Sequence, residues 1–376
     1  MGLLNFKLGV PQRGYGVRKN IPPDFIDKSV RPLDYYRFKS GIKWRFFGKL
    51  DSRDLFKFRE PATPKADLLH FFNTVAFTKT PWIVTYESLL PYFDSRRSEQ
   101  EKCIEQLLGP SCKGIAAMSH HAKLNFRWKL SQLGMGGTWD YLENKITVLY
   151  PPEELRIGYQ STEKVQFLFV AREFYKKGGL AVLRSLFHLK FEHNFDNWTA
   201  VLIGDLGSIP DQTFLSLDQV YSETKQLMQD LSSNIIHYPR MSQSQVISNM
   251  QQSHFLLHPT LQETYGYVIA EAMSCGCVPI TCGIRAIPEF IDHCKSGFLL
   301  EVKTDSNGNP KRFMSQYMWQ EIESQLCSIL IGIADGNGLN PYDELKVAAR
   351  KHIELHHNPK SHRSKLLRLY HDALAE

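Results

Sequence analysis

The stretch from Ser253 to Thr281 most constrains the fold, because a strand, a loop, a helix and a second strand follow one another within it. Residues 253–257 form a short apolar run with the length and character of a buried strand. From Tyr265 onward, apolar side chains fall at helical spacing, and Gly276 is typical of the position just past a helix end. Residues 277–281 form a second apolar run. The stretch therefore predicts a strand–helix–strand unit.

The same alternation of short apolar runs and helical patterns extends over most of the chain. Strands are expected at residues 67–72, 81–86, 113–118, 145–150, 165–170, 198–204 and 234–238. Helices are expected at residues 98–108, 119–133, 180–189, 215–231, 246–251, 314–334, 342–357 and 360–374. Such alternation predicts parallel sheets with helices on both faces. A chain of 376 residues is too long for one typical core, so we expect two α/β domains.

Two carboxylates flank the start of the helix in the 253–281 stretch. Glu263 lies at its mouth and Glu271 about two turns inside it. A helix start offers backbone N–H groups and the positive end of the dipole, which suits an anion. Carboxylates on either side can accept hydrogen bonds from hydroxyl groups. A ligand with phosphates in the middle and hydroxyl-rich rings at both ends fits this layout, and a nucleotide sugar is such a ligand.

The residues around the two glutamates carry a resemblance to a known family. They read Glu-Thr-Tyr-Gly-Tyr-x3-Glu-Ala-Met-x-Cys-Gly-x-Val-Pro from Glu263 onward. This pattern resembles the Glu-x7-Glu signature of glycosyltransferase family 4, the retaining enzymes of GT-B fold. The simpler interpretation is an amphipathic core helix with a glutamate at each end. The small and apolar residues between and after the glutamates favour the family.

The resemblance implies a GT-B architecture, in which two Rossmann-like, doubly wound domains face a central cleft. It predicts an N-terminal acceptor-side domain at residues 1–152 and a nucleotide-sugar donor-binding domain at residues 153–345. A C-terminal segment, residues 346–376, is expected to form a helix that crosses back to the first domain. The implied activity is transfer of a sugar, with retained anomeric configuration, from a nucleotide-diphosphate sugar to a glycan or lipid-linked acceptor hydroxyl.

A second motif of the family is matched upstream. The run Ala171-Arg-Glu-Phe-Tyr-Lys-Lys-Gly resembles the family's Gly-Arg-x4-Lys-Gly element, with Ala171 in place of the usual glycine. Arg172 and Lys177 have the family's spacing, and two cations at the end of a strand can neutralise phosphates. Lys176 replaces Lys177 if the register differs by one residue. Solvated loop cations are the simpler interpretation of either residue alone.

The resemblance also implies a role for each donor-side residue. Glu263 would orient the sugar hydroxyls and Glu271 the ribose hydroxyls. Arg172, Lys177 and the backbone at Thr264, Tyr265 and Gly266 would stabilise the departing diphosphate. The loop containing Arg240 and Met241 would face the nucleotide base. Pro239 stands near a common glycine of that loop, so the donor is left open between UDP- and GDP-linked sugars.

The acceptor side offers two candidate residues. Glu87 follows the strand at residues 81–86, at the position where many family members carry a histidine in Thr-x-His-Asp. Any role taken over from that histidine is therefore in doubt. His70, near the end of the preceding strand, is the second candidate. A satisfied polar side chain at a strand end is the simpler interpretation of His70.

The positive charge is concentrated near the N-terminus. Residues 1–60 hold 14 Lys and Arg against 6 Asp and Glu, whereas the whole chain has a net charge of +6. Between residues 35 and 59 these bases alternate with aromatic side chains. Such a surface suits anionic lipid headgroups or an anionic acceptor, and a solvated basic face with aromatics packed beneath it explains the pattern equally well. Nucleic-acid-binding patterns are missing from the sequence, so nucleic acid is not expected as a partner.

Cysteines, metals and rival functions complete the expectations. The seven cysteines are scattered without metal spacing, which favours reduced thiols and a cytoplasmic protein. If the basic stretch at residues 35–59 binds lipid headgroups, the protein is peripheral at the inner face of a membrane. The chain contains no Asp-x-Asp pair, so we expect no metal and no cofactor beyond the donor substrate. The alternatives are a non-catalytic binding or scaffold protein of the same fold and a nucleotide-sugar epimerase.

Overall fold

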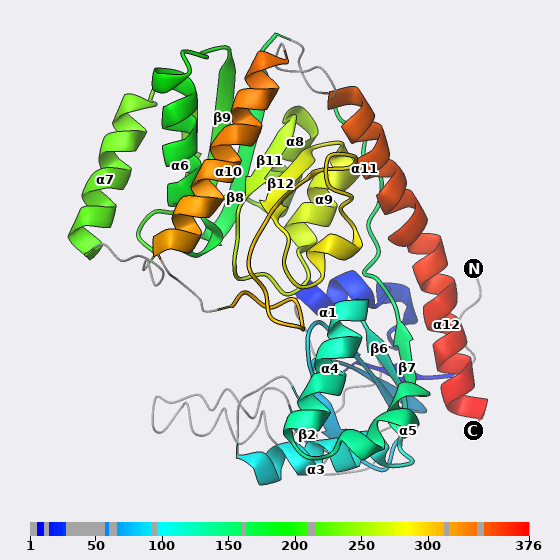
Figure 1. The fold of residues 1–376 in the computed structure, drawn as a ribbon. Helices are drawn as coiled ribbons and strands as arrows, with labels where there is room; N and C mark the ends of the chain where they lie inside the picture. The colour runs from blue at the N-terminus through cyan, green and yellow to red at the C-terminus, as the bar shows by residue number, and fades with distance from the viewer. Residues whose placement is uncertain are drawn as a thin grey trace, which may run out of the picture. The chain divides into compact units, whose positions relative to one another are not determined.

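The structure is a computed structural model that describes residues 6–10, 15–27, 57–59, 66–91, 96–159, 163–208, 216–311, 316–336 and 342–375. The chain divides into two compact units. The first comprises Met1–Pro152 and His357–Glu376, and the second comprises Glu153–His356. Each unit is built around a parallel sheet (Figure 1), so the expected mixed α/β class with two Rossmann-like sheets is confirmed.

The sheet of the first unit has five parallel strands in sequential order. They are β1 (Leu8–Gly9), β3 (Leu68–Phe72), β5 (Trp82–Tyr86), β6 (Cys112–Ala117) and β7 (Ile146–Val148). β3, β5 and β7 fall within the apolar runs that predicted strands, and β6 begins one residue before its run. A separate pair consists of β2 (Lys57–Arg59) and β4 (Val75–Phe77), which are also parallel. β4 was not predicted, because a run of three apolar residues carries no clear period.

Helices cover both faces of this first sheet. They are α1 (Tyr15–Asn20), α3 (Arg97–Leu108), α4 (His120–Gln132), α5 (Trp139–Glu143) and α12 (Pro359–Ala375), with short 3-10 turns at Pro23–Phe25 and Gly136–Thr138. Neighbouring residues on β5 point to opposite faces, as the strand period requires. Trp82 and Val84 join the core that contains residues of α3, α4 and α5, whereas Ile83 joins the core that contains residues of α1 and α12.

The last helix, α12, belongs to the first unit. Its Leu366 and Tyr370 are fully buried in the same core as Leu8 and Ile83, which unites the red and blue ends of the chain in Figure 1. Arg363 also donates two hydrogen bonds to Asp24, at 2.9 and 2.7 Å. The structure assigns the chain to the first unit from His357 onward rather than from residue 346. The reason is that the preceding helix, α11 (Tyr342–His356), packs on the second unit.

The sheet of the second unit has six parallel strands in the order β10-β9-β8-β11-β12-β13. In sequence they are β8 (Val165–Glu173), β9 (Trp198–Asp205), β10 (Ile235–Tyr238), β11 (Phe255–His258), β12 (Val278–Cys282) and β13 (Phe298–Leu300). The chain winds outward from β8 in one direction and then returns to start β11 on the other side of it. The order therefore reverses between β8 and β11, and the carboxyl ends of strands at such a reversal are where open α/β sheets bind ligands.

Helices also cover both faces of the second sheet. They are α6 (Gly179–Phe187), α7 (Leu217–Asp230), α8 (Gln243–Gln252), α9 (Tyr267–Cys275), α10 (Gln316–Asp335) and α11, with short helical turns at Tyr175–Lys177, His188–Glu192 and Ile287–Glu289. Figure 1 shows α6, α7 and α10 on one side of the strands and α8, α9 and α11 on the other. The pairs in contact agree with this division, since α6 packs on α7 and α10, and α9 packs on α8 and α11.

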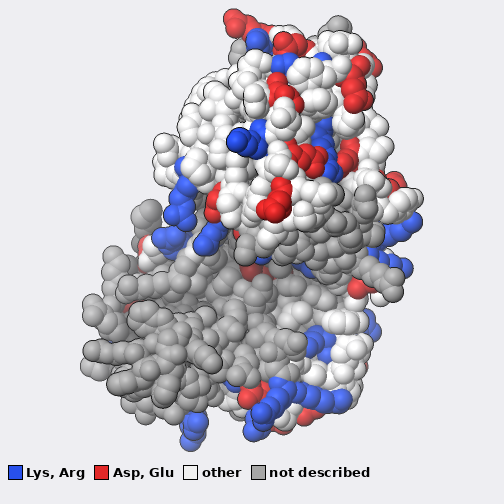
Figure 2. All heavy atoms as spheres, turned by 90° about the vertical axis from the view of Figure 1, so that its left-hand side faces the viewer, with Lys and Arg blue, Asp and Glu red and all other residues white. Residues whose placement is uncertain are grey.

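Most of the basic and aromatic stretch at residues 35–59 lies outside the described residues, which include only residues 57–59 of it. Of these, Phe58 is buried in the first core. Lys57 is largely buried as well and donates to Glu99 at 3.0 Å. Core packing thus explains Phe58, and an ion pair within the unit explains Lys57. On the upper part of the face shown in Figure 2, basic and acidic side chains are interspersed, so no single sign of charge dominates there.

Candidate functional site

The candidate site is the carboxyl edge of the second sheet, where β8 and β11 lie side by side. The chain leaves β8 into the short turn Tyr175–Lys177, and it leaves β11 at His258 into the loop that precedes α9. Gly178 lets the two segments approach closely. Its φ is +84°, and a Cβ there would lie 2.6 Å from the Pro259 carbonyl oxygen, so only glycine fits without strain.

Lys177 and Glu263 form an ion pair across this strand reversal. Lys177 Nζ donates to Glu263 Oε2 at 2.8 Å and also to the carbonyl oxygen of Gln262. Both side chains are mostly buried, with 20% and 18% of their surfaces exposed. Lys176 instead pairs with Glu173, the last residue of β8. Of the two candidate lysines, Lys177 is therefore the one that meets the first glutamate.

Glu263 is held as a carboxylate. Burial alone would raise its pKa, but the approach of the His258 ring and the positive charge of Lys177 outweigh burial and lower the pKa to about 2. The Glu263 loop is also fixed through its backbone, because Arg285 Nη1 donates to the Glu263 carbonyl oxygen at 2.9 Å. An ionised carboxyl group is an acceptor only, so Glu263 can bind donors such as sugar hydroxyls.

His258, the last residue of β11, completes the group and was not predicted as a site residue. Its side chain is 2% exposed, and Nε2 lies 3.6 Å from Glu263 Oε2. Burial, aided by the charge of Lys177, lowers the pKa of His258 against the opposing effect of Glu263, which makes the ring neutral at neutral pH. The signal in the sequence was a polar residue that ends an apolar strand immediately before the loop of the first glutamate.

Glu271 engages a different part of the unit. It lies in the second turn of α9, 8% exposed, and accepts a long hydrogen bond of 3.5 Å from Nε2 of Gln243. Gln243 is the first residue of α8, which directly follows the loop that contains Arg240 and Met241. The spacing of seven residues thus directs Glu263 toward the end of β8 and Glu271 toward the start of α8. Gln243 is a second residue that sequence reasoning missed.

Arg172 lies near the end of β8, within an irregularity in the pairing with β9 that falls between Val170 and Glu173. Its side chain is exposed, and its guanidinium makes no ion pair or hydrogen bond with any residue that the structure describes. The charge is therefore not neutralised by the protein in this part of the chain. Arg172 lies in the last part of β8, and Lys177 lies in the short turn that follows this strand.

The segment Thr264–Gly266 precedes α9 rather than belonging to it. The helix was expected from Tyr265, but it begins at Tyr267, because Gly266 has a φ of +96°, which no helical residue adopts. The Tyr265 side chain is fully buried and stacks on Phe290 with ring centroids 5.4 Å apart. Tyr265 can therefore contribute only its backbone to a ligand, and Gly266 has no side chain to contribute.

The loop with Arg240 and Met241 lies between β10 and α8. Arg240 is exposed, whereas the sulfur of Met241 accepts a weak hydrogen bond of 3.5 Å from Nδ2 of Asn249. α8 begins at Gln243, earlier than the expected Val246. The reason is a capping box, in which Ser242 and Gln245 each bind the other's backbone N–H group.

The two acceptor-side candidates of the first unit differ in their surroundings. Glu87 directly follows β5 and is half-buried. Its carboxylate accepts from Asn73 Nδ2 at 3.2 Å, and its backbone N–H donates to Asn73 Oδ1 at 3.0 Å. Glu87 therefore remains a candidate at the carboxyl end of a strand.

His70 lies entirely inside the first unit. Its ring nitrogens lie 2.8 Å from the hydroxyl groups of Tyr370 and Thr85. Burial, with a smaller effect from the charge of His362, lowers the pKa of His70 to about 3. A ring with no exposed surface and two internal partners has no atom left for a substrate, so its position supports the simpler interpretation of a satisfied structural histidine.

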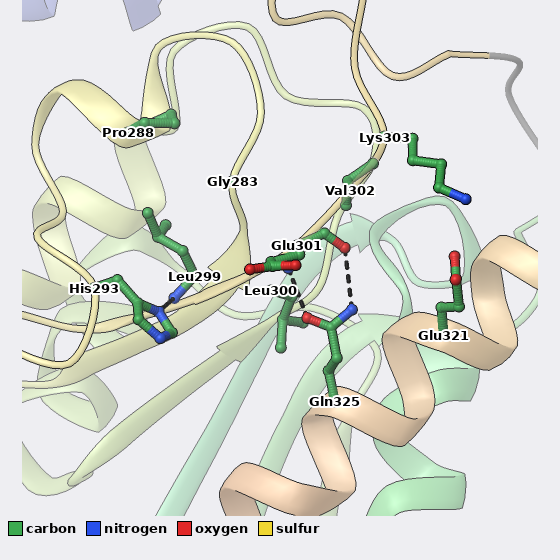
Figure 3. Close-up of a pocket in the computed structure, with 10 residues that line it drawn as sticks. All are labelled: Gly283, Pro288, His293, Leu299, Leu300, Glu301, Val302, Lys303, Glu321 and Gln325. Atoms are coloured by element: carbon green, nitrogen blue, oxygen red, sulfur yellow. Dashed lines mark hydrogen bonds between the residues drawn. The ribbon is translucent and has the colours of Figure 1, made fainter.

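A cavity of about 560 Å³ lies beyond the carboxyl ends of β12 and β13, at the outer edge of the second sheet (Figure 3). Figure 3 shows the Gln325 amide, from α10, facing the backbone of Glu301. It accepts from Glu301 N at 2.7 Å and donates to Glu301 O at 3.1 Å. Gln325 thus satisfies both backbone groups of the residue that directly follows β13. None of the predicted site residues lines this cavity.

Within the described part of the chain, no three or more His, Cys, Asp or Glu side chains are grouped so that they could hold a metal ion. Among the helices of the described residues, none is long and apolar enough to cross a membrane.

One comparison with known proteins matches the part of the chain that contains this site. Residues 153–309 match the family of glycosyl transferases group 1. The match covers less than half of the chain and lies within the second unit, where it includes the ends of β8 and β11. Together with the fold, it supports the group 1 glycosyltransferase superfamily for this chain and glycosyl transfer as its class of activity. No curated protein sequence matched the chain.

Solved structures of glycosyltransferases share the fold. A glycosyltransferase from Rickettsia africae is 15% identical, with a TM-score of 0.56 over 90% of this chain and 80% of that one. HepE of Anabaena, in complex with UDP, is 13% identical, with a TM-score of 0.54 over 81% and 78%. Sucrose-phosphate synthase from Thermosynechococcus elongatus is 14% identical, with a TM-score of 0.54 over 82% and 74%. At these identities the likeness establishes the GT-B fold alone.

Proposed function

We propose that this protein is a retaining glycosyltransferase that moves a sugar from a nucleotide-diphosphate sugar to an acceptor hydroxyl. The observation that carries the proposal is the Lys177–Glu263 ion pair at the strand reversal of the second sheet. A cation for phosphate and a carboxylate for hydroxyls meet there, inside the region that matches the group 1 glycosyl transferases. The proposal extends to family 4 within that group.

The phosphate-binding part of the site consists of Arg172 and Lys177. Arg172 makes no ion pair with a described residue, so its charge is not already compensated by a protein carboxylate there. Lys177 is held in place by the Glu263 side chain and the Gln262 carbonyl. Together with the backbone at Thr264, Tyr265 and Gly266, these two cations stabilise the negative charge that develops on the departing diphosphate.

The hydroxyl-binding part consists of the two glutamates. Glu263 accepts hydrogen bonds from the transferred sugar, and Glu271, next to the start of α8, accepts them from the ribose. The loop with Arg240 and Met241 then lies beside the base, which belongs to a UDP- or GDP-linked donor. HepE, which shares the fold, has been solved with UDP and with UDP-glucose, so UDP-linked sugars are the first donors to test.

The reaction breaks the bond between the anomeric carbon and the phosphate oxygen and forms a bond from that carbon to the acceptor oxygen. The proton of the acceptor hydroxyl passes to the departing diphosphate, so the proposal requires no protein base and no metal. Stabilisation of the diphosphate by Arg172 and Lys177 lowers the barrier, because charge builds up there as the bond to the anomeric carbon breaks. Retention follows if the acceptor attacks from the face that the phosphate leaves.

The acceptor is proposed to be a glycan or a lipid-linked sugar bound by the first unit, with Glu87 among its contacts. The basic and aromatic stretch at residues 35–59 would bind an anionic membrane surface, which places the protein in the cytoplasm at the inner face of a membrane. A role in polysaccharide biosynthesis is consistent with such an acceptor. Glu87 supports this part of the proposal because Asn73 holds its carboxylate at the carboxyl end of β5.

The decisive experiment incubates the purified protein with a panel of UDP- and GDP-linked sugars and measures release of the free nucleoside diphosphate. One donor should give release that depends on Lys177, and NMR of the product should show the anomeric configuration of that donor. Calorimetric titration with UDP and GDP tests binding alone. A protein that turns over none of the donors is the non-catalytic binding or scaffold alternative. Conversion of the sugar without diphosphate release identifies the epimerase alternative.

A further inference from the structure

The ring of His258 presents two buried nitrogens without a partner. The residue is 1% exposed, and neither Nδ1 nor Nε2 has a hydrogen-bond partner in the structure. Leaving a polar group of this kind buried and unpaired costs free energy, so an unpaired ring calls for an explanation. The contrast is His254, which directly precedes β11: this equally buried residue accepts from Gln166 N at 3.0 Å.

The unpaired ring is directed at the carboxylate of Glu263. Nε2 lies 3.6 Å from Oε2, which is about half an ångström beyond an ordinary hydrogen bond. The same oxygen already accepts from Lys177 Nζ at 2.8 Å. The other oxygen, Oε1, has no partner among the described residues, and the side chain is 18% exposed. Two donors on the protein side thus approach one oxygen, and the second oxygen is left for a ligand.

We infer that His258 is a positioning residue for Glu263: its Nε2–H group donates to Oε2 when the donor sugar binds and so fixes Oε1 toward a sugar hydroxyl. The inference rests on the proposed function and adds a residue to it. The role needs only a neutral N–H donor. The buried ring beside Lys177 can supply one, because it is uncharged at neutral pH. A glutamine side chain carries such a donor at a similar distance from the backbone, whereas leucine fills similar space without one.

The test compares the affinities for UDP and for UDP-glucose, measured by calorimetry, in His258→Leu and His258→Gln. His258→Leu should weaken UDP-glucose binding about tenfold while UDP binding changes less than about twofold, because only the sugar contacts Glu263. His258→Gln should stay within about threefold of the wild type for both ligands. His254→Leu is the matched control, since it removes an equally buried ring from the residue directly before the same strand and should leave the ratio of the two affinities unchanged.

A double-mutant cycle shows whether His258 acts through Glu263. In the Glu263→Ala background, His258→Leu should cause no further loss of UDP-glucose affinity. Equal loss of UDP and UDP-glucose affinity in His258→Leu, or equal behaviour of the Leu and Gln variants, would show a packing role and overturn the inference. If His258→Leu does not fold, failure of His258→Gln to retain UDP-glucose binding overturns it instead.

The wild-type measurements separate this inference from the proposed function. A wild-type protein that binds neither UDP nor UDP-glucose, and neither GDP nor GDP-mannose, contradicts the proposed function, and the role of His258 falls with it. If the GDP pair binds instead, the same comparison is made with that pair. A wild-type protein that binds a nucleotide sugar, with variants that all behave alike, leaves the function standing and removes only the role of His258.

Discussion

The ammonium group of Lys177 lies 2.8 Å from the carboxylate of Glu263, although 86 positions separate the two residues in the sequence. The contact joins the turn after β8 to the loop after β11, the two strands between which the sheet order reverses. This contact distinguishes Lys177 from the adjacent Lys176, which forms an ion pair with Glu173 instead. Substitution of the two adjacent lysines should therefore affect nucleotide binding differently.

Lys177→Met should weaken binding of UDP or GDP by about tenfold or more, because a partly buried cation beside a diphosphate contributes more than an exposed one. Lys176→Met is the matched control and should change the affinity less than about twofold. Both are measured by calorimetric titration at fixed ionic strength. Equal effects of the two substitutions would mean that general surface charge, rather than this ion pair, attracts the nucleotide.

Glu263 predicts a pH dependence of stability. Its pKa falls from an ordinary value of 4.5 to about 2, because His258 and Lys177 outweigh the effect of burial. A carboxyl group whose pKa is lowered by folding stabilises the protein above the unfolded pKa, and this contribution is lost as the pH falls toward the folded pKa. The stability gap between wild type and Glu263→Gln should therefore be widest near neutral pH and shrink between about pH 4.5 and 2.

Urea denaturation of both proteins across that pH range measures the gap. Glu173→Gln is the control, since an exposed ion pair such as that of Glu173 and Lys176 contributes little to stability. A gap for Glu263→Gln that stays constant from pH 7 to 3 would contradict a carboxylate stabilised by its neighbours.

The sequence predicted features that depend on neighbouring residues better than features that depend on contacts between distant segments. Most strands were predictable, because a buried parallel strand reads as a continuous apolar run. β4 and the start of α9 were not, because three apolar residues carry no period and the φ of Gly266 is set by its surroundings. Motif spacing placed Glu263 and Lys177 in one site. It selected Lys177 over Lys176 only through the register of the motif, whereas the structure shows which ammonium reaches the loop after β11.

Contacts between distant segments account for the site residues that were missed. His258 reads as one more residue of a buried strand, and only the structure shows its ring facing Glu263. Arg285 follows β12, and nothing in its sequence neighbourhood indicates that it holds the Glu263 backbone. His70 shows the converse, because a histidine near a strand end suggested the acceptor side, whereas a helix 300 positions later supplies its partner, Tyr370.

The His70–Tyr370 contact predicts a loss of stability without a loss of function. Tyr370→Phe removes the hydroxyl group and leaves a buried ring nitrogen of His70 unpaired, which should cost about 1–3 kcal/mol of unfolding free energy. Nucleotide affinity should stay unchanged, because the pair lies in the first unit. Chemical denaturation and calorimetry test the two statements, and Tyr141→Phe, at an exposed position, is the control. Lost activity at full stability would restore His70 as a substrate contact.

Substitution by alanine should change the stability of the protein in opposite directions at Gly178 and at Gly332. Gly178 has a φ of +84°, and an added Cβ would lie 2.6 Å from the Pro259 carbonyl oxygen, so Gly178→Ala must displace the turn that carries Lys177. It should destabilise the protein by more than about 1 kcal/mol and weaken nucleotide binding. Gly332 lies within α10 with nothing near its added Cβ, so Gly332→Ala should stabilise the protein by about 0.5–1 kcal/mol.

Denaturation curves for the two alanine variants, with calorimetric titration of UDP and GDP, check both halves of the comparison. Gly332→Ala should bind nucleotide as the wild type does, because the substitution acts on helix propensity alone. If Gly178→Ala were as stable as the wild type and bound nucleotide equally well, the ends of β8 and β11 would not need to approach as closely as the structure shows. The positions of Lys177 and Glu263 in one site would then lose their structural basis.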